Sequence, residues 1–257
     1  MAARSKALVA GLLALLMVAG IAVLTSTSAA AERENLKVSI ANVGSTRTPP
    51  VGPILETQKP HIMVISEAYH AREHLTAVAE RQGYILRQYG REQGAEAPGI
   101  ALLIRKDVTL NDRVLLKMSE PWWWPNPSKE REPRRYPAVD LTVSGERWLV
   151  VGVHFPPGGP DGGGMVDGKN RAAWLESKQA VQAYAANHPN PPVVAAGDFN
   201  ALASECRHHF PGFAVSEGGK VDHAMTKEGR GARFESVSRH DAPVGHGWFT
   251  FRLSAAS

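Results

Sequence analysis

The chain has 257 residues, 43% of them hydrophobic and 21% charged, which fits one ordinary globular domain with an appendage. The formal charge of +4 is too small to indicate nucleic-acid binding by itself, and it does not separate DNA from lipid headgroups or small phosphates. The single cysteine, Cys206, excludes an internal disulfide, so the domain depends on its hydrophobic core.

Residues 1–31 have the pattern of a secretory signal. Arg4 and Lys6 precede an uncharged apolar run of 18 residues, and small residues follow the run. This pattern predicts cleavage near Ala31 and an exported domain over residues 33–257. Removal of residues 1–31 takes away Arg4 and Lys6, so the formal charge falls from +4 to +2. Because the apolar run is also close to the span of a bilayer, an uncleaved membrane anchor is the second interpretation.

The exported region begins with two strands and a helix. Apolar runs predict a strand over Leu36–Ile40 that leads to Asn42, and a buried strand over His61–Ser66 that leads to Glu67. Apolar residues at helical spacing predict a helix over Ala71–Gln82.

Strands dominate the rest of the chain. Gly99–Arg105 and Val108–Met118 are expected to be neighbouring strands joined by a turn. Many strands and few helices in one continuous domain predict an α/β fold, a two-sheet sandwich flanked by helices. The remaining predicted elements are strands over Val139–Val143, Trp148–His154, Val193–Ala196, Val221–Met225, Arg233–Val237 and Trp248–Leu253, and a helix over Asn170–Asn187.

The strongest local motif is Gly197-Asp-Phe-Asn200, which follows a buried strand. Asp198 and Asn200 are two residues apart, so they project from the same side if the extended geometry continues. A carboxylate that orients water and an amide that donates to a phosphoryl oxygen suit a phosphate site. An Asp/Asn turn with purely local hydrogen bonds is the competing interpretation, and the motif alone slightly favours it.

Other strands also end or begin at polar residues that can carry chemistry. A single such residue is usually a satisfied hydrogen-bonding group. Residues of four types, Asn, Glu, His and Asp, recur at successive strand ends, and this recurrence indicates a shared site. In chain order they are Asn42, Glu67, His154, Asp222 and His246.

With these residues, the chain resembles the endonuclease/exonuclease/phosphatase superfamily, whose fold is DNase I-like. The resemblance covers essentially all of residues 33–257 and keeps the family's order of motifs. It implies a four-layer sandwich of two packed mixed β-sheets flanked by helices. The matching positions are Asn42 on the first strand, Ser66-Glu67 for the usual Gln-Glu, His154 at a strand end, the intact Gly197-Asp-Phe-Asn200 motif, and Asp222 in Val221-Asp-His-Ala224.

The terminal motif departs from the usual Ser-Asp-His. The best fit is Val244-Gly-His246, because a closing strand then follows; this places Gly245 where the family carries Asp. Asp241 could substitute for the missing carboxylate in space. A scrambled motif at His240-Asp241 is the alternative, although Gly245-His-Gly247 would then interrupt the final strand.

The resemblance implies Mg²⁺ or Mn²⁺ held by Glu67 and supported by Asn42, which suits the oxygen ligands that Mg²⁺ prefers. It also implies that His246, oriented by Asp222, activates the attacking water. The other implied roles are transition-state hydrogen bonds from His154 and Asn200, and positioning of water or assistance to the leaving group by Asp198. Zinc is disfavoured, because Cys206 is alone and the adjacent His208-His209 would point apart on a strand.

Three hypotheses follow for function. The first is an exported nuclease or related phosphodiesterase acting on nucleic acid. The second is a lipid or small-molecule phosphoesterase at the cell envelope. The third is a weakened, non-catalytic binding protein of the same fold, which Gly245 alone favours.

A loop rich in tryptophan and basic residues bears on the substrate. Trp122, Trp123 and Trp124 precede several Lys and Arg residues, so they could stack on bases or contact a membrane surface. Packing of the tryptophans under their own proline-rich loop is the favoured interpretation. The sequence indicates no obligate protein partner.

Overall fold

The structure is a computed structural model, and the fold is that of the unit Asn35–Ser257. The helices in the described part of the chain are α2 (Gly52–Gln58), α3 (Arg72–Gln82), α4 (Asn170–Asn187) and α5 (Ala203–His209). The described residues are 34–88, 99–117, 122–123, 130–131, 134–161, 170–216, 219–229 and 232–255.

The strands form two six-stranded mixed sheets in the described residues. Sheet A has the order β13 (Ala232–Arg239), β14 (His246–Ala255), β1 (Leu36–Asn42), β2 (Ile62–Ser66), β4 (Ala101–Arg105) and β3 (Tyr84–Gln88). Sheet B has the order β11 (Phe213–Val215), β12 (Asp222–Lys227), β10 (Val193–Asp198), β9 (Glu146–His154), β8 (Arg135–Val143) and β5 (Thr109–Lys117). A small separate hairpin pairs β6 (Trp122–Trp123) with β7 (Glu130–Arg131).

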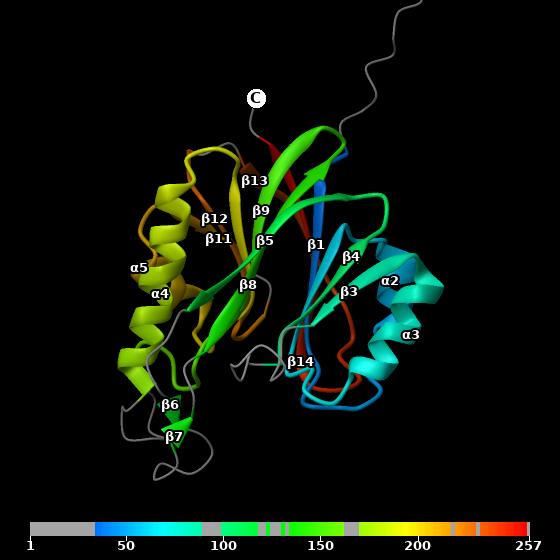
Figure 1. The fold of residues 1–257 in the computed structure, drawn as a ribbon. Coiled ribbons are helices and arrows are strands. Elements are labelled where there is room, and N and C mark those ends of the chain that lie inside the picture. The colour runs from blue at the N-terminus through cyan, green and yellow to red at the C-terminus, as the bar shows by residue number, and fades with distance from the viewer. Residues whose placement is uncertain are drawn as a thin grey trace, which may run out of the picture. The chain divides into compact units, whose positions relative to one another are not determined.

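The two sheets face each other, and helices cover their outer faces (Figure 1). Alternate side chains of β1, β2 and β4 pack against β8, β9 and β10 in the central core, while the opposite face of sheet A packs on α2 and α3. The outer face of sheet B carries α4, through buried Trp174, Val181 and Ala185. The four-layer DNase I-like sandwich expected from the resemblance is therefore confirmed.

One predicted pairing is wrong. The turn between β4 and β5 exists, but β4 lies in sheet A and β5 in sheet B, so the two strands are not neighbours. Sequence spacing suggests a hairpin there, whereas β4 pairs with β2 and β3, and β5 pairs with β8. The helices α2 and α5 were not predicted, because each is only seven residues long. His208 and His209 consequently lie on α5, not on a strand.

The register of sheet A brings three polar residues to one rim. The central strands β1 and β2 are parallel, and Asn42 at the end of β1 pairs with Ser66 at the end of β2. On the other side of β1, the antiparallel strand β14 begins at His246, which also pairs with Asn42. Asn42, His246 and the residue after Ser66, Glu67, therefore share one edge of the sheet.

Sheet B repeats this arrangement. Its parallel pair is β9 and β10, in which His154 pairs with Asp198 at the carboxyl ends. The antiparallel strand β12 begins at Asp222, which pairs with Asp198 from the other side. In both sheets a helical crossover, α2 or α4, joins the parallel strands, and ligand sites in α/β folds form at the carboxyl ends of such strands.

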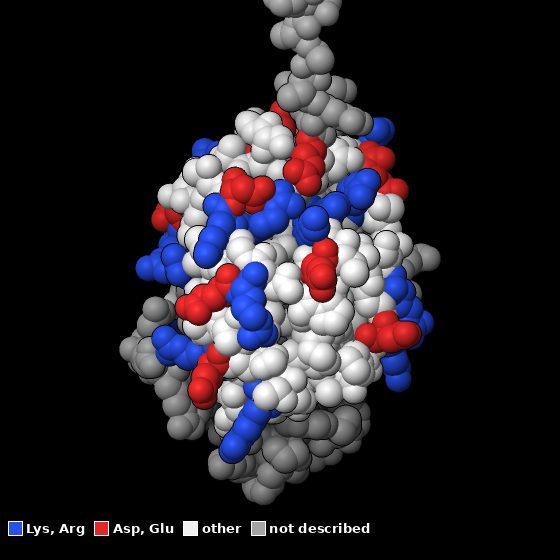
Figure 2. All heavy atoms as spheres, turned by 90° about the vertical axis from the view of Figure 1, so that its right-hand side faces the viewer, with Lys and Arg blue, Asp and Glu red and all other residues white. Residues whose placement is uncertain are grey.

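The outer surface beside sheet A has a mixed character. Figure 2 shows the face that carries α2 and α3, where Lys and Arg are interspersed with Asp and Glu.

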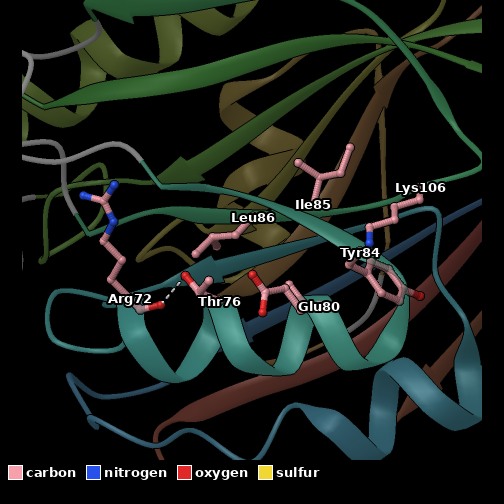
Figure 3. Close-up of a pocket in the computed structure, with 8 residues that line it drawn as sticks. Arg72, Thr76, Glu80, Tyr84, Ile85, Leu86 and Lys106 are labelled. Atoms are coloured by element: carbon pink, nitrogen blue, oxygen red, sulfur yellow. Dashed lines mark hydrogen bonds between the residues drawn. The ribbon is translucent and has the colours of Figure 1, made fainter.

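A hollow of about 360 Å³ lies between α3 and the edge strand β3, with Arg72 and Thr76 near one end and Tyr84 and Lys106 near the other (Figure 3). None of its lining residues belongs to the polar rim, so it is separate from the site described below.

Two of the sequence predictions concern residues that the structure does not describe. The signal or anchor over residues 1–31 lies outside the described residues, as does Trp124. For Trp122 and Trp123 the structure describes the backbone, which forms β6 beside α4. Among the described residues, no helix combines the length and apolar character that crossing a bilayer requires.

Candidate active site

Hydrogen bonds across the two sheets join the polar rim into one cluster. The Asn42 side-chain amide donates from Nδ2 to Glu67 Oε1 at 3.0 Å and to Asp198 Oδ2 at 3.1 Å. His154 Nε2 lies 3.8 Å from Asp198 Oδ2 and 4.0 Å from Glu67 Oε1. Residues 156 positions apart along the chain, Asn42 and Asp198, are thus in direct contact.

His246 and Asp222 form a hydrogen-bonded pair at this rim. His246 Nδ1 donates to Asp222 Oδ2 at 2.7 Å, which leaves Nε2 directed toward Asp198, 3.8 Å from its Oδ2. Asp222 is buried, while the His246 side chain is 48% exposed, so one face of the ring is open to a ligand. An imidazole oriented by a buried carboxylate is a recurrent arrangement for a general base.

The Gly-Asp-Phe-Asn motif is held by aromatic packing beneath it. Phe199 points away from the rim and packs against Phe155 with ring centroids 5.1 Å apart. Trp174 on α4 donates from its indole nitrogen to the Phe199 carbonyl at 2.8 Å. Burial of the intervening Phe199 therefore fixes Asp198 and Asn200 on the polar side.

Asn200 bonds within the site and also to its support. Its backbone N–H donates to Asp198 Oδ1 at 2.7 Å, and its side-chain amide donates to the Phe155 carbonyl at 2.8 Å. The first contact is the local Asp/Asn turn considered for this motif, so the turn and the shared cluster coexist. Asn200 has a positive φ of 48° and Glu67 has a φ of 58°, left-handed conformations that a non-glycine residue adopts at some energetic cost.

Two residues that sequence analysis missed support His154. Tyr136 donates from its hydroxyl to the His154 carbonyl at 2.9 Å, and the buried Arg134 guanidinium donates to the carbonyls of His154 and Phe155. Arg134 directly precedes β8 and Tyr136 is the second residue of that strand, and both side chains reach carbonyls at the end of β9. An Arg-x-Tyr pair opening a strand was the available signal, but it became meaningful only once β8 was placed beside β9.

The geometry decides between the two terminal-motif alignments. His246, not His240, reaches Asp222, because His240 instead contacts the Thr250 hydroxyl at 2.8 Å on the neighbouring strand. The second carboxylate near His246 is Asp198, and Asp241 is exposed. Of the two histidines, His246 is therefore the one that lies at the rim with Asp222.

Gly245 occupies a place where no side chain fits. Its φ is +60°, and a Cβ built there would lie 2.0 Å from the Asn42 carbonyl oxygen and 2.7 Å from the Asn42 carbonyl carbon. The departure from the usual Asp thus coincides with a close backbone approach between the start of β14 and the end of β1. The two site residues at this contact are His246, which follows Gly245, and Asn42.

The pKa values of His246 and Asp198 are both raised at the rim. The hydrogen bond to Asp222 raises the pKa of His246 to about 9, and the charges of Asp222, Asp198 and Glu67 act in the same direction against burial. Burial raises the pKa of Asp198 to about 7, with a further contribution from Asp222 and an opposing one from His246. The site therefore favours positive charge at His246 and neutralisation of Asp198.

A pH dependence of stability follows for the metal-free protein. The folded pKa of His246 lies above its unfolded value of about 6.5, so its charge contributes stability that is full below that pH. This contribution is lost as pH rises through about 9. We expect the difference in unfolding free energy between wild type and His246→Gln to shrink from pH 6 to pH 10. Urea unfolding in EDTA measures it, and a constant difference across this range would contradict the assignment.

The donor set at the rim fits a divalent cation at Glu67. Its side chain is 31% exposed, whereas those of Asp198 and Asp222 are only 2% and 4% exposed. A hard cation that keeps several waters needs such an accessible carboxylate. Asn42 Oδ1 accepts the Gly44 N–H at 3.0 Å, so in this arrangement the Asn42 amide holds the Glu67 carboxylate with its NH₂ group.

A second group of possible ligand atoms overlaps the catalytic pair. Asp198, Asp222 and His246 offer ligand atoms within 4.8 Å of one another. However, His246 Nδ1 and Asp222 Oδ2 are hydrogen-bonded to each other at 2.7 Å, so these two atoms are already engaged. Glu67, not this trio, is the better candidate for a principal metal ligand.

The fold and the rim together define a class of protein: a two-sheet α/β sandwich with a His–carboxylate pair beside a candidate metal site. A sequence profile of the Endonuclease/Exonuclease/phosphatase family matches residues 41–250. The chain belongs to this family, whose members are divalent-metal-dependent hydrolases acting on phosphoester bonds. A search of curated proteins gave no match.

Solved structures share the fold at low sequence identity. The human Nocturnin catalytic domain with bound sulfate is 14% identical, with a TM-score of 0.63, covering 87% of this chain and 96% of that one. D. rerio TDP2 complexed with single strand DNA product is 11% identical (TM-score 0.59; 85% and 98% coverage). The Bacteroides thetaiotaomicron mannosyl-6-phosphatase is 14% identical (TM-score 0.59; 86% and 100% coverage).

Proposed function

We propose that this protein is an exported, divalent-metal-dependent phosphodiester hydrolase that acts on nucleic acid by water attack on phosphorus. The observation that carries the proposal is the His246–Asp222 pair, whose free Nε2 faces the cluster of Asp198, Asn42 and Glu67. A base, a carboxylate cluster and hydrogen-bond donors at one rim are the groups that phosphoester hydrolysis requires.

Each residue has a distinct part in this mechanism. His246, in its neutral form, removes a proton from the attacking water at Nε2, while Asp222 keeps the ring oriented through Nδ1. His154 and Asn200 donate hydrogen bonds to the phosphoryl oxygens as negative charge develops there. Asp198 orients water or assists the leaving group. Glu67, held by Asn42, would bind Mg²⁺ or Mn²⁺, and such a cation would neutralise charge on the phosphoryl oxygens.

Hydrolysis of bis-p-nitrophenyl phosphate tests this function directly. We expect release of p-nitrophenolate with Mg²⁺ or Mn²⁺, no release with excess EDTA, and none from Asp198→Ala. The chromophore is followed continuously, and the variant's fold is checked by circular dichroism. Equal turnover with EDTA, or undiminished turnover by Asp198→Ala, would sink the mechanism.

Loss of the Glu67 carboxylate charge is expected to weaken metal binding. Glu67→Gln keeps the size of the side chain and an oxygen for the Asn42 amide, but removes the negative charge that attracts a hard cation. We expect the Kd for Mn²⁺ to rise by about 10-fold or more. Isothermal titration calorimetry measures the Kd without substrate. Glu73→Gln, on α3 outside the rim, is the matched control and should leave it unchanged.

The choice of nucleic acid rests on the family and on one fold neighbour. TDP2, which shares the fold, was solved with single strand DNA product, whereas another neighbour is a mannosyl-6-phosphatase. Parallel incubation with plasmid DNA, RNA, sphingomyelin and mannose 6-phosphate separates these classes. Replacement of Trp122, Trp123 and Trp124 by alanine tests the tryptophan loop: a loss confined to nucleic-acid cleavage favours stacking, and a loss of liposome binding favours a membrane surface.

Export rests on the N-terminal pattern. We expect the expressed full-length chain to be recovered outside the cytoplasm with a new N-terminus near Ala31. Fractionation followed by N-terminal sequencing measures this. Recovery in the membrane fraction with residues 1–31 intact would favour the anchor instead, and a full-length chain in the cytoplasm would contradict export.

A further inference from the structure

Two exposed large hydrophobic residues closely follow rim residues in the chain, one after β2 of sheet A and one after β10 of sheet B. The large hydrophobic residues that are exposed in the described part of the chain are Tyr69, Val114, Leu202 and Val237. Tyr69 follows Glu67 by two residues, and Leu202 follows Asn200 by two. Isolated exposed apolar residues are ordinary, but two of these four border the candidate active site.

The backbone has the same left-handed conformation before both residues. Glu67 and Asn200 each have a positive φ; Glu67 comes directly after β2, and Asn200 comes two residues after β10 ends. Two residues span at most about 7 Å, so Tyr69 and Leu202 stay close to the rim. A ligand larger than a bare phosphate would therefore meet an apolar surface on either side of the cluster.

Tyr69 is placed as a supported platform. The ideal Cβ position of Gly99 lies 3.0 Å from three ring carbons of Tyr69, Cγ, Cδ1 and Cδ2, so the ring covers the Gly99 backbone. The Ala68 N–H donates to the Gly99 carbonyl at 2.6 Å and ties the preceding residue to the same segment. The side chain is nevertheless 44% exposed. A ring that is held against backbone and still 44% exposed is preorganised for stacking.

We propose that Tyr69 forms a stacking subsite for the nucleobase next to the scissile phosphate. This inference rests on the proposed phosphodiesterase function and assigns its substrate class. A planar base has a π-face that stacks on an aromatic ring without a requirement for sequence, whereas a sugar phosphate has none. Leu202 adds an aliphatic surface on the flank that belongs to sheet B.

The test compares two diesters that share one leaving group. Thymidine 5′-(p-nitrophenyl phosphate) carries a base, and methyl p-nitrophenyl phosphate does not. For wild type we expect a higher kcat/KM on the thymidine diester. In Tyr69→Ala the ratio of the two kcat/KM values should fall about 10-fold, mainly through KM, because one base–aromatic stack is lost. Tyr69→Phe should keep the ratio, since the ring remains.

A control variant accompanies this test, and failure of the stacking subsite gives a different result from failure of the phosphodiesterase function. Val237→Ala removes an equally exposed apolar side chain from β13, away from the rim, and should leave both rates unchanged. If wild type hydrolyses both diesters and Tyr69→Ala lowers them equally or not at all, the stacking subsite is overturned while the phosphodiesterase stands. If wild type hydrolyses neither diester with Mg²⁺ or Mn²⁺, the underlying function fails instead.

Binding gives a second readout that needs no turnover. In EDTA, we expect Tyr69→Ala to bind a fluorescent oligothymidylate about 5-fold or more weakly than wild type. Its affinity for an abasic strand of the same length should change far less, because that strand keeps every phosphate. An equal loss for both strands would mean that Tyr69 acts on the backbone and would overturn the proposal.

Discussion

His246→Ala is expected to lower kcat for bis-p-nitrophenyl phosphate by about 1,000-fold, within the range that loss of a general base gives. The ring is held by Asp222 at 2.7 Å, and its other nitrogen faces Asp198 across the rim. For comparison, His154 Nε2 stands farther from a buried carboxylate, 3.8 Å from Asp198 Oδ2. KM should change much less than kcat, because the ring acts on water in the transition state.

The matched control for this result is His240→Ala. His240 precedes the same strand, and its ring contacts the Thr250 hydroxyl, so its loss removes a histidine without touching the rim. We expect its kcat to stay within about 2-fold of wild type, since distant independent sites contribute separately. Asp222→Asn should fall between the two, because an amide can still bond the ring but no longer stabilises the imidazolium. Similar rates for the two histidine variants would refute the assignment of the base.

Gly245→Ala is expected to destabilise the fold by about 3 kcal/mol or more and to disturb the site at the same time. The new Cβ would lie 2.0 Å from the Asn42 carbonyl oxygen, so β14 and the end of β1 must move apart. The Trp248 indole also donates to that carbonyl at 3.2 Å, so the displacement would break a buried contact. Urea unfolding gives the stability, and Mn²⁺ affinity reports on the Asn42–Glu67 pair.

Gly212→Ala separates the backbone cost from the steric one. Gly212 has a similar positive φ of 77°, but a Cβ there meets nothing within 4 Å. We expect this variant to lose only about 1 kcal/mol, the cost of a left-handed conformation for a residue with a Cβ. Equal losses at the two glycines would show that the close approach to Asn42 is unimportant.

Gly245 also bears on the hypothesis of a weakened, non-catalytic protein. The family's Asp cannot be restored by a single substitution, because any side chain at this position meets the Asn42 carbonyl. Gly245→Asp should therefore lower stability and hydrolysis together. The glycine is a requirement of this backbone, and the remaining residues of the rim are in contact with one another. The hypothesis of a weakened protein therefore rests on this one glycine alone.

The sequence by itself determined most of the strands, the order of motifs and the candidate residues, although it did not predict β3 or β11. Short segments in which apolar residues alternate with polar ones, or follow one another without a break, predict strands from the local pattern alone. The intact Gly197-Asp-Phe-Asn200 motif marks the end of one of these strands. The fold class followed from the resemblance that these motifs carry. All seven predicted site residues lie along one rim because parallel strands end on the same side of a sheet.

Only the tertiary structure decided which of these residues touch. The Asn42–Asp198 contact joins the two sheets, and no local pattern encodes how two separate sheets align. The same limit explains the wrong pairing of β4 with β5, since sequence proximity predicts a hairpin whereas burial of both apolar faces places the strands in different sheets. The support of His154 by Arg134, and the closeness of Gly245 to Asn42, likewise arise from packing between distant segments.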